Sequence, residues 1–78
     1  AAAGARRFRR IETWRERLIA EGPAALEELA QSYPDAASED FARQVAAARA
    51  ERSRTGATGP AARELFRSLR ALLERDRG

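Results

Sequence analysis

The sequence contains no cysteine, no histidine, no lysine and no methionine. Without cysteine it has neither a disulfide framework nor a thiolate metal site, which fits a reducing cytoplasm. Without histidine or cysteine, a nucleophile would need a serine or threonine activated by a carboxylate or an arginine, and no such pair occurs at a useful spacing. The sequence therefore predicts a protein that is not an enzyme and that holds no cofactor and no metal.

Long apolar runs are also missing. The chain has no apolar stretch of the length that a signal peptide (about 7–15 residues) or a membrane span (about 20) requires. We therefore expect a soluble, cytoplasmic domain with no membrane partner and no small-molecule substrate. Because position 1 is alanine rather than methionine, we expect a piece of a longer chain rather than a processed product.

The chain has 78 residues, which allows one domain at most. Alanine accounts for 19 of its apolar residues, and only fifteen apolar residues are large. We expect these fifteen to build one thin core with no room for an enclosed ligand pocket. They are Phe8, Ile11, Trp14, Leu18, Ile19, Leu26, Leu29, Tyr33, Phe41, Val45, Leu65, Phe66, Leu69, Leu72 and Leu73.

Charge is segregated along the chain. The fifteen basic residues are all arginine and face twelve acids, so the net charge is only +3. Residues 1–19 carry +4, residues 20–42 carry −6, residues 43–59 carry +3 and residues 60–78 carry +2. The small total thus conceals a strongly dipolar chain.

Apolar residues recur at spacings of three and four through almost the whole sequence, which is typical of helices. A single valine and the lack of any alternating run argue against strands. We predict an all-α fold, a small helical bundle of three to four helices in a single domain spanning 1–78. The helices are expected at about residues 5–21, 23–32, 37–53 and 60–76.

Glycine and proline mark the expected boundaries. Gly22-Pro23 ends the first helix and begins the second, since glycine suits a helix C-terminus and proline a first turn. Pro34 disfavours helical geometry in the residue before it, and Asp35 or Ser38 is suited to cap the third helix.

The loop Gly56-Ala-Thr-Gly59 matches the G-x-x-G string with which KH domains clamp a nucleic-acid backbone. KH domains need strands, which this chain lacks, and the loop also lacks the G-K-[ST] sequence of a phosphate-binding P-loop. We interpret it as a turn before Pro60, the first residue of the last helix.

Adjacent acids give no sign of a catalytic or metal site. Neighbours such as Glu39 and Asp40 point about 100° apart on a helix, so they diverge. Asp35, Glu39 and Asp40 also lack the glycine and the ligand spacing of a calcium loop. We expect these side chains to be solvated and to favour a helix start.

Three groups of arginines form the candidate RNA-binding site, because clustered arginine is the expected footprint for phosphate. Helical spacing aligns one group on the fourth helix and one on the first, and the third group ends the third helix. The groups are Arg63, Arg67 and Arg70; Arg6, Arg10 and Arg17; and Arg49, Arg52 and Arg54. Only Glu51 and Glu64 supply acids between residues 49 and 70, so most of those charges should lack a local partner.

Other roles for these arginines stay open. They include solvated faces with pairs such as Arg17 with Glu21 or Arg70 with Glu74, an acidic protein partner, and the acidic second helix of the chain itself. Arg15 is a separate case, because it projects into the apolar arc of the first helix and needs a partner there. We predict an ion pair between Arg15 and an acid such as Glu28.

Short motifs follow one another in a specific order and spacing over about residues 8–74. They are Ile11-Glu-Thr-Trp-Arg-Glu-Arg-Leu-Ile19, Gly22, Ala25-Leu26, Tyr33-Pro-Asp-Ala36 and Pro60-Ala-Ala-Arg-Glu-Leu-Phe-Arg-Ser-Leu-Arg70. This pattern resembles the C-terminal half of the YjgA family, also called the DarP family of dual-action ribosomal maturation proteins. The positions that match it are Arg15, Arg17, Pro34, Asp35, Arg63, Phe66, Arg67 and Arg70.

The resemblance implies an all-helical, cytoplasmic, non-enzymatic protein that associates with the large ribosomal subunit. Such a protein would bind the ribosomal RNA of that subunit and assist its late maturation, near the peptidyl transferase centre. This chain would then be a C-terminal bundle without its N-terminal portion, and we expect a monomer. A helical protein–protein interaction module with no RNA role is the alternative.

The chain departs from the family pattern in two places. Relatives carry an Asn-Lys-Pro-Pro-like run where this chain has Thr55–Pro60, and Arg-Asn-Ala where it has Val45-Ala-Ala-Ala48. If those polar residues contact RNA in relatives, this chain must bind RNA through other contacts, or more weakly.

Overall fold

A computed structural model describes residues 2–75 of the chain. The elements, in order, are α1 (Ala2–Glu21), α2 (Pro23–Ser32), the short 3-10 helix η1 (Pro34–Ala36), α3 (Glu39–Thr55) and α4 (Pro60–Arg75). Residues 2–75 contain no strand, so the predicted all-α fold is confirmed.

The observed boundaries follow local chemistry. α1 begins earlier than the predicted residue 5, since alanine has the highest helix propensity. α3 begins at Glu39 rather than 37 because Ser38 is its N-cap, with the Ser38 hydroxyl accepting a hydrogen bond from the Phe41 N–H at 3.2 Å. α3 ends at Thr55 rather than at the predicted residue 53, with Gly56 as its C-cap. The predicted end of the fourth helix, residue 76, lies outside the described residues.

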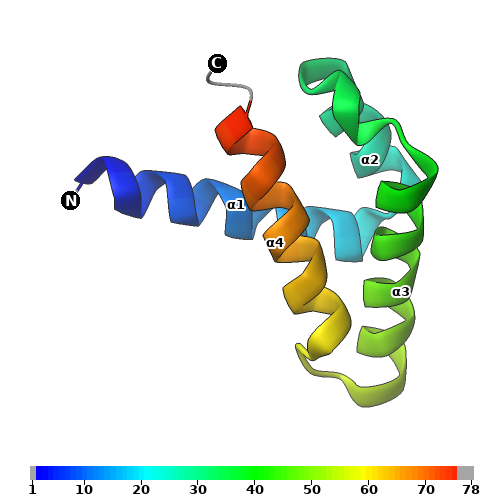
Figure 1. Cartoon of the computed structure of the whole chain (residues 1–78). Helices are drawn as coiled ribbons and strands as arrows, with labels where there is room; N and C mark the ends of the chain where they lie inside the picture. The colour runs from blue at the N-terminus through cyan, green and yellow to red at the C-terminus, as the bar shows by residue number, and fades with distance from the viewer. Residues whose placement is uncertain (1, 76–78) are drawn as a thin grey trace.

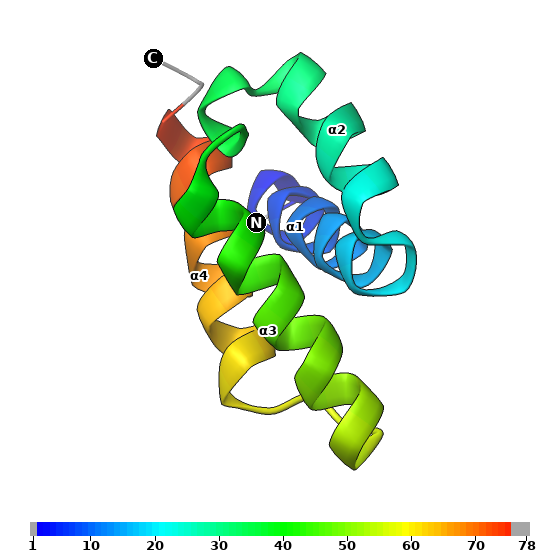
Figure 2. The ribbon, with the colours of Figure 1, turned by 90° about the vertical axis from the view of Figure 1, so that its right-hand side faces the viewer.

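The helices pack around α1. α3 and α4 form an antiparallel hairpin, and α1 crosses α4 with its C-terminal end near α3 (Figure 1). Seen from the side, α1 lies between α2 and the hairpin (Figure 2). None of the helices within residues 2–75 has both the length and the apolar character that a membrane crossing requires.

The core lies where the C-terminal half of α1 meets the other helices. Eleven of the fifteen large apolar residues are buried, together with four alanines from α2, η1, α3 and α4. The most deeply buried large side chains are Leu18, Leu29, Leu65 and Leu69. Trp14, Leu26 and Phe66 are only partly buried against this core.

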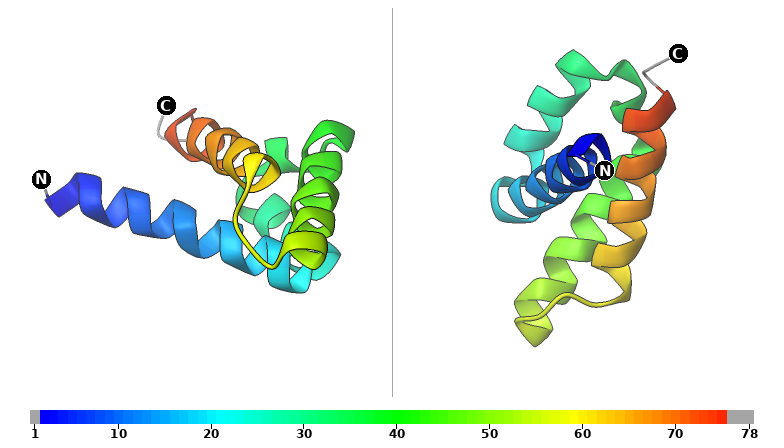
Figure 3. Two further views of the ribbon diagram at one scale, coloured as in Figure 1. Left: turned by 90° about the horizontal axis from the view of Figure 1, so that it is seen from below. Right: turned by 90° about the vertical axis from the view of Figure 1, so that its left-hand side faces the viewer.

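Phe8 is the exception, and its prediction as a core residue is wrong. Its side chain is 54% exposed. α1 is 20 residues long, or about 30 Å, and its N-terminal part projects past the other helices (Figure 3, left). Helical spacing places Phe8 on the apolar face of α1, but the bundle covers that face only in part at this position.

Candidate nucleic-acid interface

The first group of candidate arginines lies on the solvent side of α4. Arg63, Arg67 and Arg70 are all exposed, while α4 buries its leucines on the opposite side. Arg67 lies 3.5 Å from Glu64, and Arg70 donates a hydrogen bond to Glu74 at 3.1 Å. Such exposed pairs within one helix stabilise it by only about 0.3–0.5 kcal/mol, so they leave the guanidinium groups available.

The second group, on α1, turns largely toward α2. Arg10 donates a 2.6 Å hydrogen bond to the hydroxyl of Tyr33, the residue that follows α2, and its guanidinium carbon lies 5.9 Å from the centre of that ring. Arg6 is exposed and forms no ion pair with any residue that the structure describes. Arg10 therefore helps to hold α1 against α2.

Arg17 links the same two helices. It pairs with Glu21 at 3.2 Å within α1 and with Glu28 across to α2, and its guanidinium carbon lies 5.0 Å from the Trp14 ring centre. Its hydrogen bond to Glu28 lowers the pKa of that carboxyl, and its hydrogen bonds to Glu28 and Glu21 raise its own pKa. The acidic second helix of the chain is thus a partner of this group.

Arg15 does form an ion pair with an acid, as predicted, but Glu28, the acid named for it, pairs with Arg17. Arg15 instead lies 3.3 Å from its neighbour Glu16, with its guanidinium carbon 5.4 Å from the ring centre of Phe66 on α4. Arg15 thus packs its charge against an aromatic face, a favourable arrangement that sequence spacing on α1 alone did not reveal.

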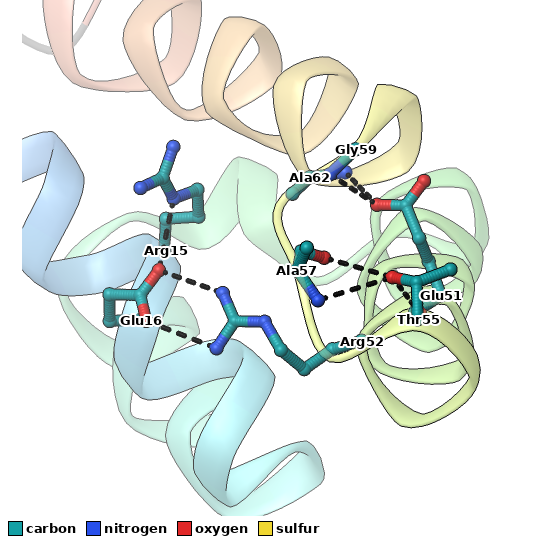
Figure 4. A network of polar contacts seen from close by, with 8 residues as sticks. All are labelled: Arg15, Glu16, Glu51, Arg52, Thr55, Ala57, Gly59 and Ala62. Atoms are coloured by element: carbon teal, nitrogen blue, oxygen red, sulfur yellow. Dashed lines mark hydrogen bonds and ion pairs between the residues drawn. The ribbon is translucent and has the colours of Figure 1, made fainter.

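The third group ends α3, and two of its members reach α1. Arg49 donates to the main-chain oxygen of Ile19 at 3.1 Å, near the C-terminal end of α1, where a cation is favourable. Arg52 forms two parallel hydrogen bonds with Glu16, at 3.2 and 3.3 Å (Figure 4). The Arg52 hydrogen bond lowers the pKa of the Glu16 carboxyl. Arg54 is exposed.

Within the part of the chain that the structure describes, most arginines between residues 49 and 70 have no acid partner close in the sequence, as expected. Of these arginines, only Arg67 and Arg70 pair with described acids of their own helix. Arg49 and Arg52 find polar partners on α1, far away in the sequence. Arg63 and Arg54 form no ion pair with the residues described.

Glu51 plays a role that the sequence did not indicate. Its carboxylate accepts hydrogen bonds from the N–H groups of Gly59 and Ala62 at 3.0 and 3.2 Å (Figure 4). It also accepts one from the Ala61 N–H at 2.9 Å. The Ala61 bond is the main cause of a lowered pKa for this carboxyl. A Cβ at Gly59 would lie 2.7 Å from a Glu51 oxygen, so the second glycine of the loop makes room for the carboxylate.

Glu51 thus occupies the N-terminus of α4, and the loop is a turn, as predicted. Two of the acids weighed as metal ligands pair with arginines instead. Asp35 pairs with Arg75 at 3.3 Å and Asp40 pairs with Arg43. Across residues 2–75, no three acidic side chains lie close enough together to hold a metal ion.

A groove on the surface between α1 and α4 adjoins the arginines of α4. Its lining residues are Arg7, Phe8, Ile11, Phe66, Arg70 and Glu74. Arg70 thus lies beside an open groove that carries two aromatic side chains, Phe8 and Phe66.

Comparison with known proteins gives a consistent result. The model of the family described as "Dual-action ribosomal maturation protein DarP" matches residues 1–70. A relative of that name from Stenotrophomonas maltophilia (strain K279a) is 44% identical over 64 residues, 82% of this chain and 32% of its own length. One from Xanthomonas oryzae pv. oryzae (strain PXO99A) is 46% identical over 63 residues, 81% of this chain and 32% of its own.

The chain therefore spans about a third of the length of the curated relatives it matches. No solved structure matches it significantly. The family match covers most of the chain and agrees with the motifs from Ile11 to Arg70. The chain thus belongs to the DarP family of dual-action ribosomal maturation proteins.

Proposed function

We propose that this chain is the ribosomal RNA-binding, C-terminal part of a factor that assists late maturation of the large ribosomal subunit without catalysing a reaction. The observation that carries the proposal is its membership in a family whose relatives are named ribosomal maturation proteins. A cytoplasmic monomer is part of the same proposal.

Phosphate neutralisation is the proposed mechanism. Arg63, Arg67 and Arg70 present an exposed row on one rigid helix, with Arg6 and Arg54 exposed on other elements. Arginine binds phosphate through two parallel hydrogen bonds, and contacts of this kind position a protein on RNA without reading its sequence. The bundle would therefore recognise the shape of a folded RNA.

The remaining candidates contribute differently. Arg10, Arg17, Arg49 and Arg52 join helices to one another, but a guanidinium has five N–H donors and none of the four uses all of them. We propose that these four maintain the bundle and bind phosphate only with the donors left over.

Cosedimentation of the chain with large subunits or their precursors tests the proposal. If several phosphates are contacted, binding should weaken steeply from low to moderate salt, because log K falls by about 0.7–0.9 for each phosphate per tenfold rise in salt. Binding should also disappear after RNase digestion. Retention after digestion, or no association at all, would contradict the RNA-binding role.

Two double variants with the same change in net charge test whether the arginines of α4 form the RNA-binding surface. The double variant Arg63→Ala/Arg67→Ala should bind several-fold more weakly and lose about one to two phosphate contacts from the salt dependence. Arg43→Ala/Arg75→Ala removes the same charge from two arginines whose side chains are 75% and 68% exposed and which pair with acids elsewhere. Equal losses in both would show that only net charge matters.

A protein–protein interaction module remains the second candidate. The observation in its favour is the exposed acid along α2 and at the start of α3, including Glu27, Glu39 and Asp40. An acidic surface of this kind fits a basic protein rather than RNA. Binding that survives RNase but is lost in Glu27→Gln/Glu39→Gln would favour this candidate.

A further inference from the structure

The sequence Arg6-Arg7-Phe8-Arg9-Arg10 surrounds one aromatic residue with four arginines. Among the large apolar side chains whose exposure the structure describes, Phe8 alone is exposed, at 54%. An exposed aromatic ring on a helix of this kind contributes little to the core. An exposed ring flanked by arginines suits a binding partner that is both aromatic and anionic.

Phe8 is the outer member of a row of three side chains in contact, Phe8, Phe66 and Arg15. Its ring centre lies 5.4 Å from that of Phe66, at an interplanar angle of 54°. On the same face of α1, two turns further on, Arg15 holds its guanidinium carbon 5.4 Å from the same Phe66 ring. Residues 8 and 15 are about 10 Å apart along a helix axis, so Phe66 lies between them.

The side of the Phe8 ring that faces away from Phe66 is therefore exposed to solvent. Phe66 is partly buried and in contact with both of its neighbours, so it steadies the Phe8 ring without covering it. A pre-positioned ring loses little conformational freedom when a flat ligand stacks on it.

The charges around the ring decide the kind of ligand. Arg7 and Arg70 line the groove beside Phe8, and Arg9, the next residue along α1, is exposed. An apolar protein surface docking on Phe8 would have to bring these guanidinium groups out of water without compensation. RNA supplies a π-face for the ring and phosphates for the arginines together.

We propose that Phe8 stacks on an unpaired base of RNA, and that Arg7, Arg9 and Arg70 neutralise the phosphates on either side of that base. The inference rests on the proposed function and adds to it one base contact, at a loop, bulge or end of the RNA. The arginines of α4 continue from the same groove through Arg70, so the base site and the phosphate row form one surface.

Substitutions of Phe8 test the stacking, with single-stranded oligoadenylate as the probe. We expect Phe8→Ala to weaken binding about tenfold, since stacking on an aromatic contributes about 1–3 kcal/mol per base. Phe8→Tyr should retain the affinity, and Phe8→Leu should behave like Phe8→Ala because it keeps apolar area but has no π-face. The slope of affinity against salt should be the same in all four proteins.

Inorganic polyphosphate is the matched probe without bases. The Phe8→Ala variant should bind polyphosphate as the unmodified chain does, because the arginines are intact. Ultraviolet crosslinking of the chain to oligoadenylate should place the attached nucleotide on the peptide that contains Phe8.

The outcomes separate the two proposals. If the chain binds oligoadenylate and large subunits, and the Phe8→Ala variant binds each of them as tightly as the unmodified chain does, the stacking inference is wrong while the proposed function stands. If Phe8→Ala loses affinity for polyphosphate as well, the ring supports the arginines rather than a base, and the inference is again wrong. If the unmodified chain binds no RNA, both proposals fail.

Discussion

Gly22 and Gly56 both adopt positive φ, at 65° and 70°, but their surroundings differ. Gly22 is buried, and a Cβ there would lie 2.7 Å from the guanidinium carbon of Arg49. At Gly56 nothing lies within 4 Å of the same position. Glycine is thus favoured at both positions by the positive φ, and at Gly22 also because the Arg49 side chain leaves no room for a Cβ.

We expect Gly22→Ala to destabilise the chain by about 2–3 kcal/mol and Gly56→Ala by about 1 kcal/mol. Urea unfolding followed by circular dichroism would measure both. Arg49→Ala combined with Gly22→Ala should recover part of the difference, because the clash then disappears while the strain of positive φ stays. Equal losses in the two single variants would show that Arg49 simply moves aside.

Glu51 predicts a pH dependence. Its side chain is mostly buried, the residue being 7% exposed, and its hydrogen bonds lower its pKa below the ordinary 4.5. A carboxyl with a lowered pKa in the folded state stabilises that state fully above its unfolded pKa and loses this contribution as the pH falls through the folded pKa. The chain should therefore lose stability below about pH 4.5.

The variant Glu51→Gln supplies the control. At pH 7 it should lower Tm by about 5 °C, because both carboxylate oxygens accept hydrogen bonds whereas an amide has only one accepting oxygen. Its Tm should vary less than that of the unmodified chain between about pH 3 and 5. Since Glu16 and Glu28 also have lowered pKa values, some dependence will remain in the variant. Parallel Tm curves for the two proteins would exclude Glu51 as the source.

α4 carries the most sharply divided surface, with leucines inside and arginines outside. Leu65 is completely buried. Leu65→Ala should destabilise the chain by about 2–5 kcal/mol, which for a domain of this size approaches the whole free energy of unfolding. Loss of the cooperative thermal transition in circular dichroism would be the expected result.

Phe8→Ala is the contrasting change on α1. It removes a larger side chain, yet it should destabilise the chain by less than about 1 kcal/mol because the ring is already more than half exposed. A loss as large as that from Leu65→Ala would mean that Phe8 is part of the core in solution, contrary to the structure.

Helices were predictable where local chemistry decides them. Gly22-Pro23, Ser38 and Pro60 mark boundaries through backbone conformation and capping, and the structure places the helix ends at or beside them. η1 and the early start of α1 were not predicted. A single 3-10 turn has no apolar period to detect, and the alanines before Arg6 have high propensity but no core-facing pattern.

The partners of individual side chains were less predictable than the helices. Spacing on α1 correctly aligned Phe8 with Ile11, but how far the other helices extend along α1 decides that only Ile11 is buried. In the same way, Glu28 was available to Arg15 and to Arg17 on sequence grounds. The packing of α1 against α2 assigns it to Arg17.

Six of the candidate arginines that the structure describes divide into two classes. Arg17, Arg49 and Arg52 each connect two helices, whereas Arg63, Arg67 and Arg70 contact acids within α4 or no described acid. The triple variant Arg17→Ala/Arg49→Ala/Arg52→Ala should therefore lower the free energy of unfolding clearly. The triple variant Arg63→Ala/Arg67→Ala/Arg70→Ala should change it by less than about 1 kcal/mol.

The two triple variants carry the same change in net charge, so they control for each other. Chemical denaturation at a fixed, moderate salt concentration would compare their stabilities. Similar losses in both would indicate that overall charge, rather than the contacts between helices, governs stability.

The Glu51 carboxylate also determines how the start of α4 exchanges with solvent. The first amides of a helix ordinarily have no partner and exchange their hydrogens quickly. In this chain Ala61 and Ala62 donate to a side chain of α3, so their exchange requires Glu51 to move away from the start of α4. Their deuterium uptake therefore measures how often the contact between α3 and the start of α4 opens. In most helices, uptake at the first amides measures only the fraying of the helix itself.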